Sequence, residues 1–375
     1  MKKNSKIRPD LIKRSEKIGV LDIGSNSIRL VIYKGMDRDP IPVLNEKVLC
    51  KLGEDLEKTG NLSEAGCEIA INNIARFTEL VKRMQLSRFY VFATAALRDA
   101  ANGNEFAKEL ERRFNFEINI LSGGSEATLS ALGVLSAFPG LDGIIGDLGG
   151  GSLELINVEN GKIQDRVSLP LGSLRLRPLQ DCNPSSLMQG IKDELSRVPW
   201  ISKFNKRPIF VVGGSWRNLA RMHMSANRYP LHIIHGYKIT SLPFLSFLEK
   251  IAHSNLTDLE AMRGVSKKRL NEVNISAAIL QCLLDLGKNN YVIFSAFGIR
   301  EGWIFKGLSP EEQKKDPLLV NCEKIAFNAR RFALTSNELE NWMLPLFQNL
   351  DEQNRRLLKA ACILSDFAWA EHPTY

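Results

Sequence analysis

The stretch VLDIGSNSIRLVIY, beginning at Val20, decides the fold, because the segment IGDLGGGSLELINV, beginning at Ile145, repeats its pattern. Each copy has an apolar run typical of a strand, an acidic residue, a turn of small residues and a second apolar run. Four identical pairs recur at an offset of 125 positions: Asp22 and Asp147, Gly24 and Gly149, Ser27 and Ser152, Leu30 and Leu155. The repeat indicates duplication, so we predict two similar domains of about 125 residues or more.

Strands and helices alternate around the two copies. Runs of β-branched and aromatic residues predict strands at residues 18–23, 28–33, 88–93, 117–121, 143–148, 153–158 and 208–212. Between them, Ala70, Ile74 and Phe77 recur at helical spacing after Ser63, a candidate N-cap. This alternation predicts an α/β architecture. Residues 318–375 have helical spacing without strand patterns, and this helical region looks unfinished at the end of the chain.

Length and composition place the chain among globular proteins with two domains and additional material. Its 375 residues are 44% hydrophobic and 25% charged, which excludes disorder, collagen-like repeats and a small disulfide scaffold. The net charge of +8 favours an anionic partner without choosing its class. Residues 1–17 alone carry +5, which we interpret as a solvated basic tail, with a contact arm for a polyanion as the alternative.

The sequence gives no sign of export or of a membrane segment. There is no apolar run of about 18 residues, and no apolar stretch follows the basic tail to make it a signal peptide. The six cysteines are dispersed without a CxxC pair, which favours buried thiols in a reducing compartment over a zinc site. We therefore predict a cytoplasmic protein without membrane contact.

The turn of the first copy is a candidate anion site. Small residues allow a tight turn to bring backbone N–H groups near an anion, and Ser25, Asn26 and Ser27 add side-chain donors. Asp22, at the end of the preceding strand, could hold a divalent cation. An ordinary β-hairpin with a polar turn is the alternative interpretation.

The turn of the second copy is the stronger candidate. Gly149, Gly150 and Gly151 precede Ser152, and three glycines between strands are entropically costly unless a structural or binding need offsets that cost. A phosphate cradle of backbone N–H groups is one such need. Asp147 repeats the position of Asp22. Two such turns facing each other would hold a phosphate chain and its magnesium.

Further residues could complete this site. Arg98 follows a strand and can bind a phosphate through two hydrogen bonds, or it can be a surface arginine of a helix. Glu126, at a strand-to-helix turn, can activate water or can complement the helix dipole. Glu154 can assist the water or the metal, or can point outward from its strand. Gly213 and Gly214 follow a strand and could lie beside a nucleoside or a more distant phosphate.

Together these motifs resemble the exopolyphosphatase/guanosine pentaphosphatase (Ppx/GppA) family over roughly residues 17–306. The resemblance rests on DIGSNSIRL at 22–30, ATAALRDAANG at 93–103, SGGSEA at 122–127, DLGGGSLEL at 147–155, LPLGSLRL at 169–176, VVGGSWRNLA at 211–220 and SAFGIREG at 295–302. It implies an actin-like ATPase (ribonuclease H-like) fold, in which duplicated α/β domains enclose a cleft. This implication agrees with the internal repeat.

The repeat and the resemblance divide the chain into four parts. A basic tail at 1–17 precedes actin-like domain I at 18–140 and actin-like domain II at 141–310. Residues 311–375 form a C-terminal helical domain that looks truncated. The resemblance also implies a homodimer.

Roles for the candidate residues are carried over from the resemblance. It implies that Glu126 is the catalytic base, that Glu154 is a second catalytic carboxylate, and that Asp22 and Asp147 bind magnesium or another divalent cation. The residues implied to bind phosphate are Ser25, Asn26, Ser27, Arg98, Gly149, Gly150, Gly151 and Ser152, and Gly213 and Gly214 are added as candidates.

Two positions depart from the family pattern. Ser125 stands where the family usually has the first of two adjacent glutamates, which makes the surroundings of the base less negative. Leu153 stands where a threonine is common, which removes a hydroxyl near the phosphates.

The function that we expect is magnesium-dependent removal of the terminal phosphate from inorganic polyphosphate. Hydrolysis of guanosine pentaphosphate is the close alternative, because both substrates are phosphoric anhydrides. A phosphotransferase or ATPase of the same fold would place phosphate on an acceptor other than water. A polyphosphate or nucleotide sensor with weakened catalysis would bind without turnover. None of these functions requires a specific nucleic acid partner.

Overall fold

The computed structural model describes residues 16–182, 184–266, 270–329, 336–347 and 349–367. Most of the predicted basic tail, residues 1–15, lies outside this part of the chain. The described residues form two compact units. The larger unit comprises the residues up to Met36 together with Ile41–Lys306, and the smaller unit comprises Asp37–Pro40 together with the residues from Gly307 onward.

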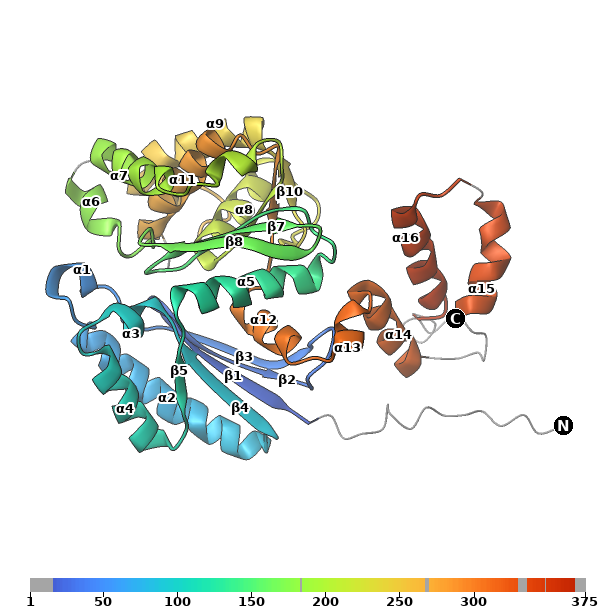
Figure 1. The fold of residues 1–375 in the computed structure, drawn as a ribbon, viewed down its shortest axis with the longest axis horizontal. Helices are drawn as coiled ribbons and strands as arrows, with labels where there is room; N and C mark the ends of the chain where they lie inside the picture. The colour runs from blue at the N-terminus through green and yellow to red at the C-terminus, as the bar shows by residue number, and fades with distance from the viewer. Residues whose placement is uncertain (1–15, 183, 267–269, 330–335, 348, 368–375) are drawn as a thin grey trace. The chain divides into compact units, whose positions relative to one another are not determined.

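The first sheet contains the N-terminal copy of the repeat. Its strands, in the order in which they lie side by side, are β3 (Pro42–Leu49), β2 (Ser27–Tyr33), β1 (Ile18–Ile23), β4 (Arg88–Ala93) and β5 (Ile118–Ile120). β2 is antiparallel to both β1 and β3, whereas β4 is parallel to both β1 and β5. The turn between β1 and β2 therefore lies at the edge where β4 and β5 also end (Figure 1).

The second sheet repeats this arrangement. Its strands in order are β8 (Lys162–Leu169), β7 (Leu153–Glu159), β6 (Gly143–Leu148), β9 (Ile209–Val212), β11 (Tyr291–Phe294) and β10 (Lys238–Thr240). The first five have the same order and relative directions as the strands of the first sheet. β6 begins at Gly143, 125 positions after Ile18 at the start of β1. The topology confirms the duplicated α/β fold that the repeat predicts.

Two helices pack between the sheets, α5 (Gly123–Ala137) and α12 (Ile299–Lys306) (Figure 1). They approach closely because glycines occupy their contact. A Cβ at Gly133 would lie 2.0 Å from the carbonyl oxygen of Gly298, and a Cβ at Gly302 would lie 1.8 Å from that of Leu129. The packing of these helices joins the two sheets into one unit.

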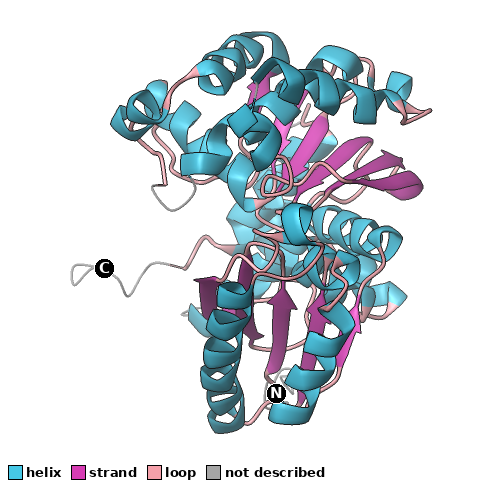
Figure 2. Ribbon diagram, turned by 90° about the vertical axis from the view of Figure 1, so that its left-hand side faces the viewer, coloured by secondary structure: helices cyan, strands magenta, loops and turns pink. Residues whose placement is uncertain are grey.

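The outer faces of both sheets are covered by further helices (Figure 2). α2 (Glu64–Met84) and α4 (Gly103–Phe114) cover the first sheet, and α8 (Gly214–Ala226) and α11 (Leu270–Gly287) pack on the second. The other helices of this unit are α1 (Leu56–Thr59), α3 (Ala95–Asp99), α6 (Arg177–Cys182), α7 (Pro184–Ser196), η2 (Ile201–Phe204), α9 (Ser241–His253) and α10 (Leu256–Ala261).

The elements follow from the sequence pattern where a buried face is clear. β1, β4 and β6 occupy the predicted residues, β2, β7 and β9 differ from the prediction by one residue at one end, and β5 is one residue shorter at each end. β3, β8, β10 and β11 are not predicted. Charged and amide side chains interrupt β3 and β8, whose residues are mostly exposed or only partly buried. α2 begins after Ser63 and buries Ala70, Ile74 and Phe77 as expected, although the Ser63 side chain makes no capping hydrogen bond.

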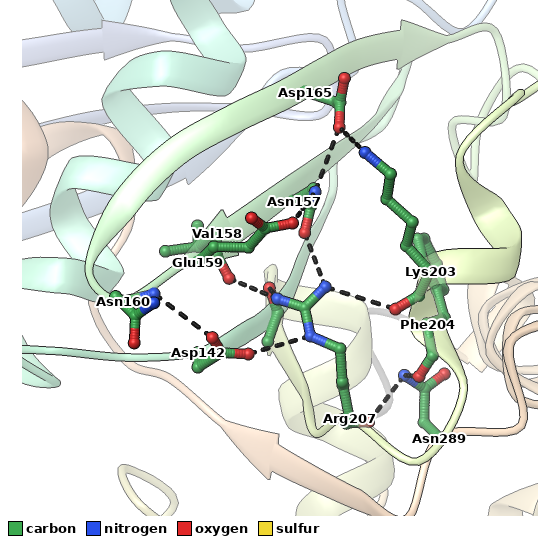
Figure 3. Close-up of polar contacts among 11 residues, drawn as sticks. Asp142, Asn157, Val158, Glu159, Asn160, Asp165, Lys203, Phe204, Arg207 and Asn289 are labelled. Atoms are coloured by element: carbon green, nitrogen blue, oxygen red, sulfur yellow. Dashed lines mark hydrogen bonds and ion pairs between the residues drawn. The ribbon is translucent and has the colours of Figure 1, made fainter.

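An arginine ties together the end of the second sheet that lies away from the β6–β7 turn (Figure 3). The Arg207 guanidinium donates to Asp142 Oδ1 at 3.0 Å, to Asn157 Oδ1 at 2.7 Å and to the Val158 carbonyl oxygen at 2.6 Å. The buried Asn157 also donates to Asp165 Oδ2 at 3.1 Å. These contacts hold β6, β7 and β8 together at the end opposite to the turn.

The smaller unit is helical and has a small core. Its helices are α13 (Pro310–Lys314), α14 (Pro317–Ala329), α15 (Ser336–Met343), η4 (Leu344–Leu346) and α16 (Glu352–Ile363). Cys322, Ala360 and Ile363 form the core. Arg38 is buried in this unit and donates to the Lys315 carbonyl oxygen at 2.9 Å. Among the described residues of the whole chain, no helix is long and apolar enough to cross a bilayer.

Candidate active site

A cavity of about 150 Å³ lies at the edge where β1 and β6 end, and both copies of the repeat line it. The candidate residues among its lining are Asp22, Ser25, Asn26, Ser27, Glu126, Asp147, Gly149, Gly150, Gly151, Ser152, Glu154, Gly213 and Gly214. Arg98 does not line the cavity, but it donates a hydrogen bond to Glu126, which does. The fold thus brings nearly all of the predicted site residues to one place.

The two turns are closed by the same hydrogen bond. The Gly24 N–H donates to the Ser27 carbonyl oxygen at 3.1 Å, and the Gly149 N–H donates to that of Ser152 at 2.9 Å. These two bonds are related by the same offset of 125 positions as the sequence repeat. The local sequence pattern therefore specifies one turn geometry, used twice.

In the first turn, the carbonyl groups point toward a supporting loop. The Gly53 N–H donates to the Ser25 carbonyl oxygen at 2.9 Å, and the Lys51 N–H donates to that of Asn26 at 3.0 Å. In a trans peptide the C=O and the following N–H point in opposite directions. The N–H groups of Asn26 and Ser27 consequently point away from this support, as an anion-binding turn requires.

In the second turn, carbonyl groups also point toward a supporting segment, but they come from positions one residue earlier in the repeat. The Ser173 N–H donates to the Gly149 carbonyl oxygen at 3.2 Å, and the Leu174 N–H donates to that of Gly150 at 2.9 Å. The N–H groups of Gly150 and Gly151 therefore point away from the supporting segment. Both glycines line the cavity, so these amides are suited to bind phosphate oxygens.

The glycines of the second turn also have a packing role. A Cβ at Gly151 would lie 2.8 Å from both the Ala95 Cβ and the Ser25 Oγ, and a Cβ at Gly150 would lie 3.2 Å from the Ser25 Cβ. The two turns are thus in direct contact, and a larger side chain would push them apart. Close approach of the turns accounts for part of the glycine run that the sequence attributed to phosphate binding.

Glu126 lies in the first turn of α5, and only 5% of its surface is exposed. Arg98 donates to Glu126 Oε2 at 2.8 Å, to Asp99 Oδ1 at 3.0 Å and to the Leu121 carbonyl oxygen at 3.3 Å. Burial raises the pKa of Glu126 to about 7 in spite of the Arg98 contact. Arg98 holds the carboxylate of Glu126 in place, and its phosphate-binding role stays a prediction.

Two further carboxylates are buried beside Glu126. Ser168 donates to Glu154 Oε1 at 2.8 Å, and Ser130 donates to Asp147 Oδ2 at 2.5 Å. Burial, together with the nearby charges of Glu126 and Asp147, raises the pKa of Glu154 well above its ordinary value. Burial thus raises the pKa of both glutamates of the site.

The two aspartates suit a magnesium ion that is shared with a phosphate. Asp22 accepts a hydrogen bond from Arg300 at 2.8 Å through Oδ2, and Asp147 uses the same oxygen toward Ser130. Mg²⁺ needs only one or two protein carboxylates when phosphate oxygens and water complete its shell. Among the described residues, no group of three His, Cys, Asp or Glu side chains could hold a metal ion by itself. The donor set fits an ion held jointly with substrate.

A buried glutamate from α11 links the first turn to the support of the second. Glu272 accepts hydrogen bonds from Asn26 Nδ2 at 2.6 Å, from Ser215 Oγ at 3.0 Å and from Ser173 Oγ at 3.3 Å. The Asn26 side-chain amide is thus engaged in positioning its turn. The sequence analysis did not single out Glu272, which lies 246 positions from Asn26.

Gly213 has a structural reason for its conformation. Its φ of +114° is rarely adopted by other residues, and a Cβ there would lie 2.4 Å from the Leu148 carbonyl oxygen. Gly213 caps the start of α8 and, with Gly214, lines the cavity. The packing requirement exists whether or not a ligand lies beside these two glycines.

With this geometry established, comparison with known proteins identifies the family. The model of the Ppx/GppA phosphatase family matches residues 31–311. The chain belongs to this family. It is accordingly a hydrolase of the phosphatase type.

Relatives of the Ppx/GppA family agree in sequence and in fold. Exopolyphosphatase 1 of Mycobacterium leprae is 26% identical over 311 residues, covering 79% of this chain and 90% of its own. The structure of an exopolyphosphatase from Cytophaga hutchinsonii has a TM-score of 0.70 at 22% identity, covering 77% of this chain and 97% of its own. The Aquifex aeolicus Ppx/GppA member has a TM-score of 0.64 at 23% identity, covering 78% and 99%.

The two departures from the Ppx/GppA pattern lie outside the cavity lining. Ser125 is exposed in the first turn of α5, where its Oγ lies 2.9 Å from that of Ser122. Leu153 is fully buried in the core of the second sheet. Neither substitution removes a residue that lines the cavity.

Among the described residues, four basic ones that the sequence analysis did not select line the cavity: Arg29, Lys47, Arg217 and Arg300. Three of them lie inside stretches that carry the Ppx/GppA resemblance, DIGSNSIRL, VVGGSWRNLA and SAFGIREG. These three residues could therefore have been selected from the sequence, because each is a basic residue within such a stretch. Lys47 had no comparable signal, because β3 was not predicted.

Proposed function

We propose that the chain is an exopolyphosphatase, which removes the terminal phosphate of inorganic polyphosphate by attack of water. The observation that carries this proposal is one cavity in which two anion-binding turns meet two buried glutamates. Catalysis of phosphoryl transfer is mostly positioning and stabilisation of charge. The two turns suit the positioning of the phosphate. Together with the basic side chains of the lining, they also suit the stabilisation of charge.

In the proposed reaction, Glu126 accepts a proton from the attacking water. The water oxygen forms a bond to the terminal phosphorus, the bridging P–O bond breaks, and its electron pair leaves with the bridging oxygen on the shortened chain. A pKa of about 7 suits a base that works near neutral pH. Arg98 orients the carboxylate that takes the proton.

The proposed phosphate contacts come from both turns. Backbone N–H groups of Ser27 and Gly151 suit the phosphate oxygens, on which negative charge accumulates as the bridging bond breaks. Mg²⁺ or another divalent cation, held through Asp22 and Asp147, would neutralise part of that charge when bound. Burial raises the pKa of Glu154 well above its ordinary value, which suits a carboxyl group that donates a hydrogen bond to the water or to the phosphate.

The lining favours polyphosphate over guanosine pentaphosphate. Among the described residues that line the cavity there is no aromatic side chain, so a guanine base has no stacking surface in the cavity. The relatives from Mycobacterium leprae and Cytophaga hutchinsonii are both named as exopolyphosphatases. These observations support the linear polymer as the substrate.

We also propose a compartment and an assembly for this activity. The cytoplasm suits a chain in which all the cysteines that the structure describes are free thiols. A homodimer is what the family resemblance implies. Sedimentation velocity of the purified chain tests the second statement, because a homodimer has twice the mass of a 42.1 kDa chain.

The test is phosphate release from polyphosphate and from guanosine pentaphosphate, measured side by side with magnesium present. We expect faster release from polyphosphate, and a loss of about 10²–10⁴-fold in kcat for Glu126→Gln. Phosphate that appears on an added acceptor instead of in water would establish a phosphotransferase. Binding of polyphosphate without release would establish a sensor, and full activity of Glu126→Gln would remove the base assignment.

A further inference from the structure

One buried carboxylate joins three segments of the cavity wall without lining the cavity itself. Glu272 lies in the first turn of α11, and only 5% of its surface is exposed. Its Oε1 accepts a hydrogen bond from Asn26, and its Oε2 accepts hydrogen bonds from Ser173 and Ser215. All three donors are buried side chains that line the cavity. Glu272 therefore lies directly behind the cavity wall.

The three donors come from different parts of the fold. Asn26 belongs to the β1–β2 turn of the first sheet. Ser173 belongs to the segment that supports the β6–β7 turn, because its N–H donates to the Gly149 carbonyl oxygen. Ser215 lies in the first turn of α8, which follows β9. The carboxylate thus joins the turn of the first sheet to two segments that belong to the second.

Asn26 is held in two directions. Its carbonyl oxygen accepts hydrogen bonds from the N–H groups of Cys50 and Lys51 at 3.2 and 3.0 Å, within the half that contains the first sheet. Its side-chain amide donates to Glu272 at 2.6 Å, on a helix that packs on the second sheet. Because peptide groups are planar, fixing both ends of this residue also restricts the direction of the N–H groups of Asn26 and Ser27.

The second turn cannot be held in this way. The position equivalent to Asn26, 125 residues later, is Gly151, which has no side chain. That turn is supported through its carbonyl groups, which accept hydrogen bonds from the N–H groups of Ser173 and Leu174. The first turn therefore depends on a side chain from the opposite half of the unit, and the second turn does not.

We propose that Glu272 is a positioning residue for phosphate binding. It holds the β1–β2 turn against the second sheet at the spacing at which the N–H groups of both turns contact one phosphate chain. Ser173 and Ser215 fix the carboxylate, and Asn26 links it to the turn. A turn that is already in place binds its ligand without first losing conformational freedom, so the contact increases affinity. The inference rests on the proposed function and deepens it.

A thermodynamic cycle of two single variants and their double variant tests this role. Calorimetry measures the binding of tripolyphosphate with magnesium in the Glu126→Gln background, which slows turnover. We expect Glu272→Ala and Asn26→Ala each to weaken binding about tenfold, because both remove the same hydrogen bond to a charged group. The double variant should bind no more than about twofold more weakly than either single variant. Glu272→Gln keeps one accepting oxygen and should lose less affinity than Glu272→Ala.

Asn274→Ala is the matched control, because Asn274 is another buried polar residue of α11. Its side-chain amide donates to the carbonyl oxygens of Ile251 and Ser254 at 3.1 and 2.7 Å, and none of these residues lines the cavity. We expect the control to lower the temperature of thermal unfolding and to leave tripolyphosphate binding within about twofold. A loss of binding equal to that of Glu272→Ala would show a general effect of stability and overturn the inference.

The remaining outcomes also decide the question. Additive losses in the double variant would show that Asn26 and Glu272 act independently, which overturns the positioning role. In steady-state assays with Glu126 intact, Glu272→Ala should raise KM more than it lowers kcat, and the reverse would place Glu272 in the chemical step instead. If Glu272→Ala does not fold, the cycle is completed with Glu272→Gln, which should have little effect once Asn26→Ala is present.

Failure of this inference and failure of the proposed function are distinguishable. The cycle measures binding alone, so an absence of phosphate release by the wild-type chain would remove the proposed function and leave the positioning role to be decided by the cycle. An absence of tripolyphosphate binding by the Glu126→Gln chain would remove the positioning role as well.

Discussion

The two copies of the repeat place the same turn at the end of equivalent strands and opposite charges beside it. In the first sheet the row across three strands is Asp22, Arg29 and Lys47, and in the second it is Asp147, Glu154 and Ser168. The aspartate and the turn are common to both copies. The next two positions differ in charge. We infer from this difference that the two sheets have different chemical roles.

The comparison assigns separate tasks to equivalent positions. Duplication supplies two turns that face one cavity and are suited to anion binding. Two identical sheets, however, would present the same side chains to both ends of a substrate. Carboxylates in one row suit the handling of water and protons, and cations in the other suit the binding of phosphate. Each of the following predictions tests whether the two rows separate in this way.

Among substitutions in the two rows, the largest effect is expected from Glu154→Gln in the second sheet. Loss of an ionisable group beside the reacting water should lower kcat about 10²-fold and leave KM within about twofold. Steady-state phosphate release from polyphosphate measures both constants. Arg29→Ala should show the reverse pattern, with KM raised and kcat nearly unchanged. Equal changes of kcat and KM in both variants would refute the different roles of the two rows.

The pH dependence should show an intermediate effect. Because burial raises the pKa of Glu126 to about 7, a base at this position loses its ionised form as the pH falls through 7. We expect kcat to decrease about tenfold per pH unit below that value and to level off above it. The residual rate of Glu126→Gln, measured with the same substrate, separates this titration from that of the phosphate groups. A midpoint below pH 5 would contradict the proposed role.

The smallest effect is expected from Ser168→Ala. Ser168 donates one hydrogen bond to Glu154 at 2.8 Å and does not line the cavity. Loss of one such bond, worth about 1 kcal/mol, should lower kcat about fivefold with KM unchanged. Lys47→Ala, at the equivalent position of the first sheet, should change KM alone. A kcat loss for Lys47→Ala that matches that of Ser168→Ala would erase the distinction between the rows.

Much of the site could be predicted because its chemistry is local. The residues from Asp22 to Ser27 and from Asp147 to Ser152 form complete turns within six positions each, and glycines and hydroxyl side chains mark them clearly. The strands that precede them have buried faces and strong apolar runs. The prediction was weaker for Arg98, whose contact with Glu126 depends on how α3 packs beside α5.

The missed residues share a physical reason. Lys47 belongs to β3, a largely exposed strand without a clear apolar pattern, so neither the strand nor its pairing with Arg29 could be predicted. Glu272 and Arg300 come from helices that lie more than two hundred positions from their partners Asn26 and Asp22. Such pairs form only when the two sheets close around α5 and α12.

The sequence by itself determined the duplication, the two turns and the residue types available for phosphate chemistry, because each depends on spacing within a few residues. Only the tertiary structure decided which charges meet and how they titrate. Burial raises the pKa of Glu126 and leaves Arg29 Nε without a partner among the described residues, and both effects come from elements far apart in the chain. Desolvation depends on everything packed around a group, which a local pattern does not specify.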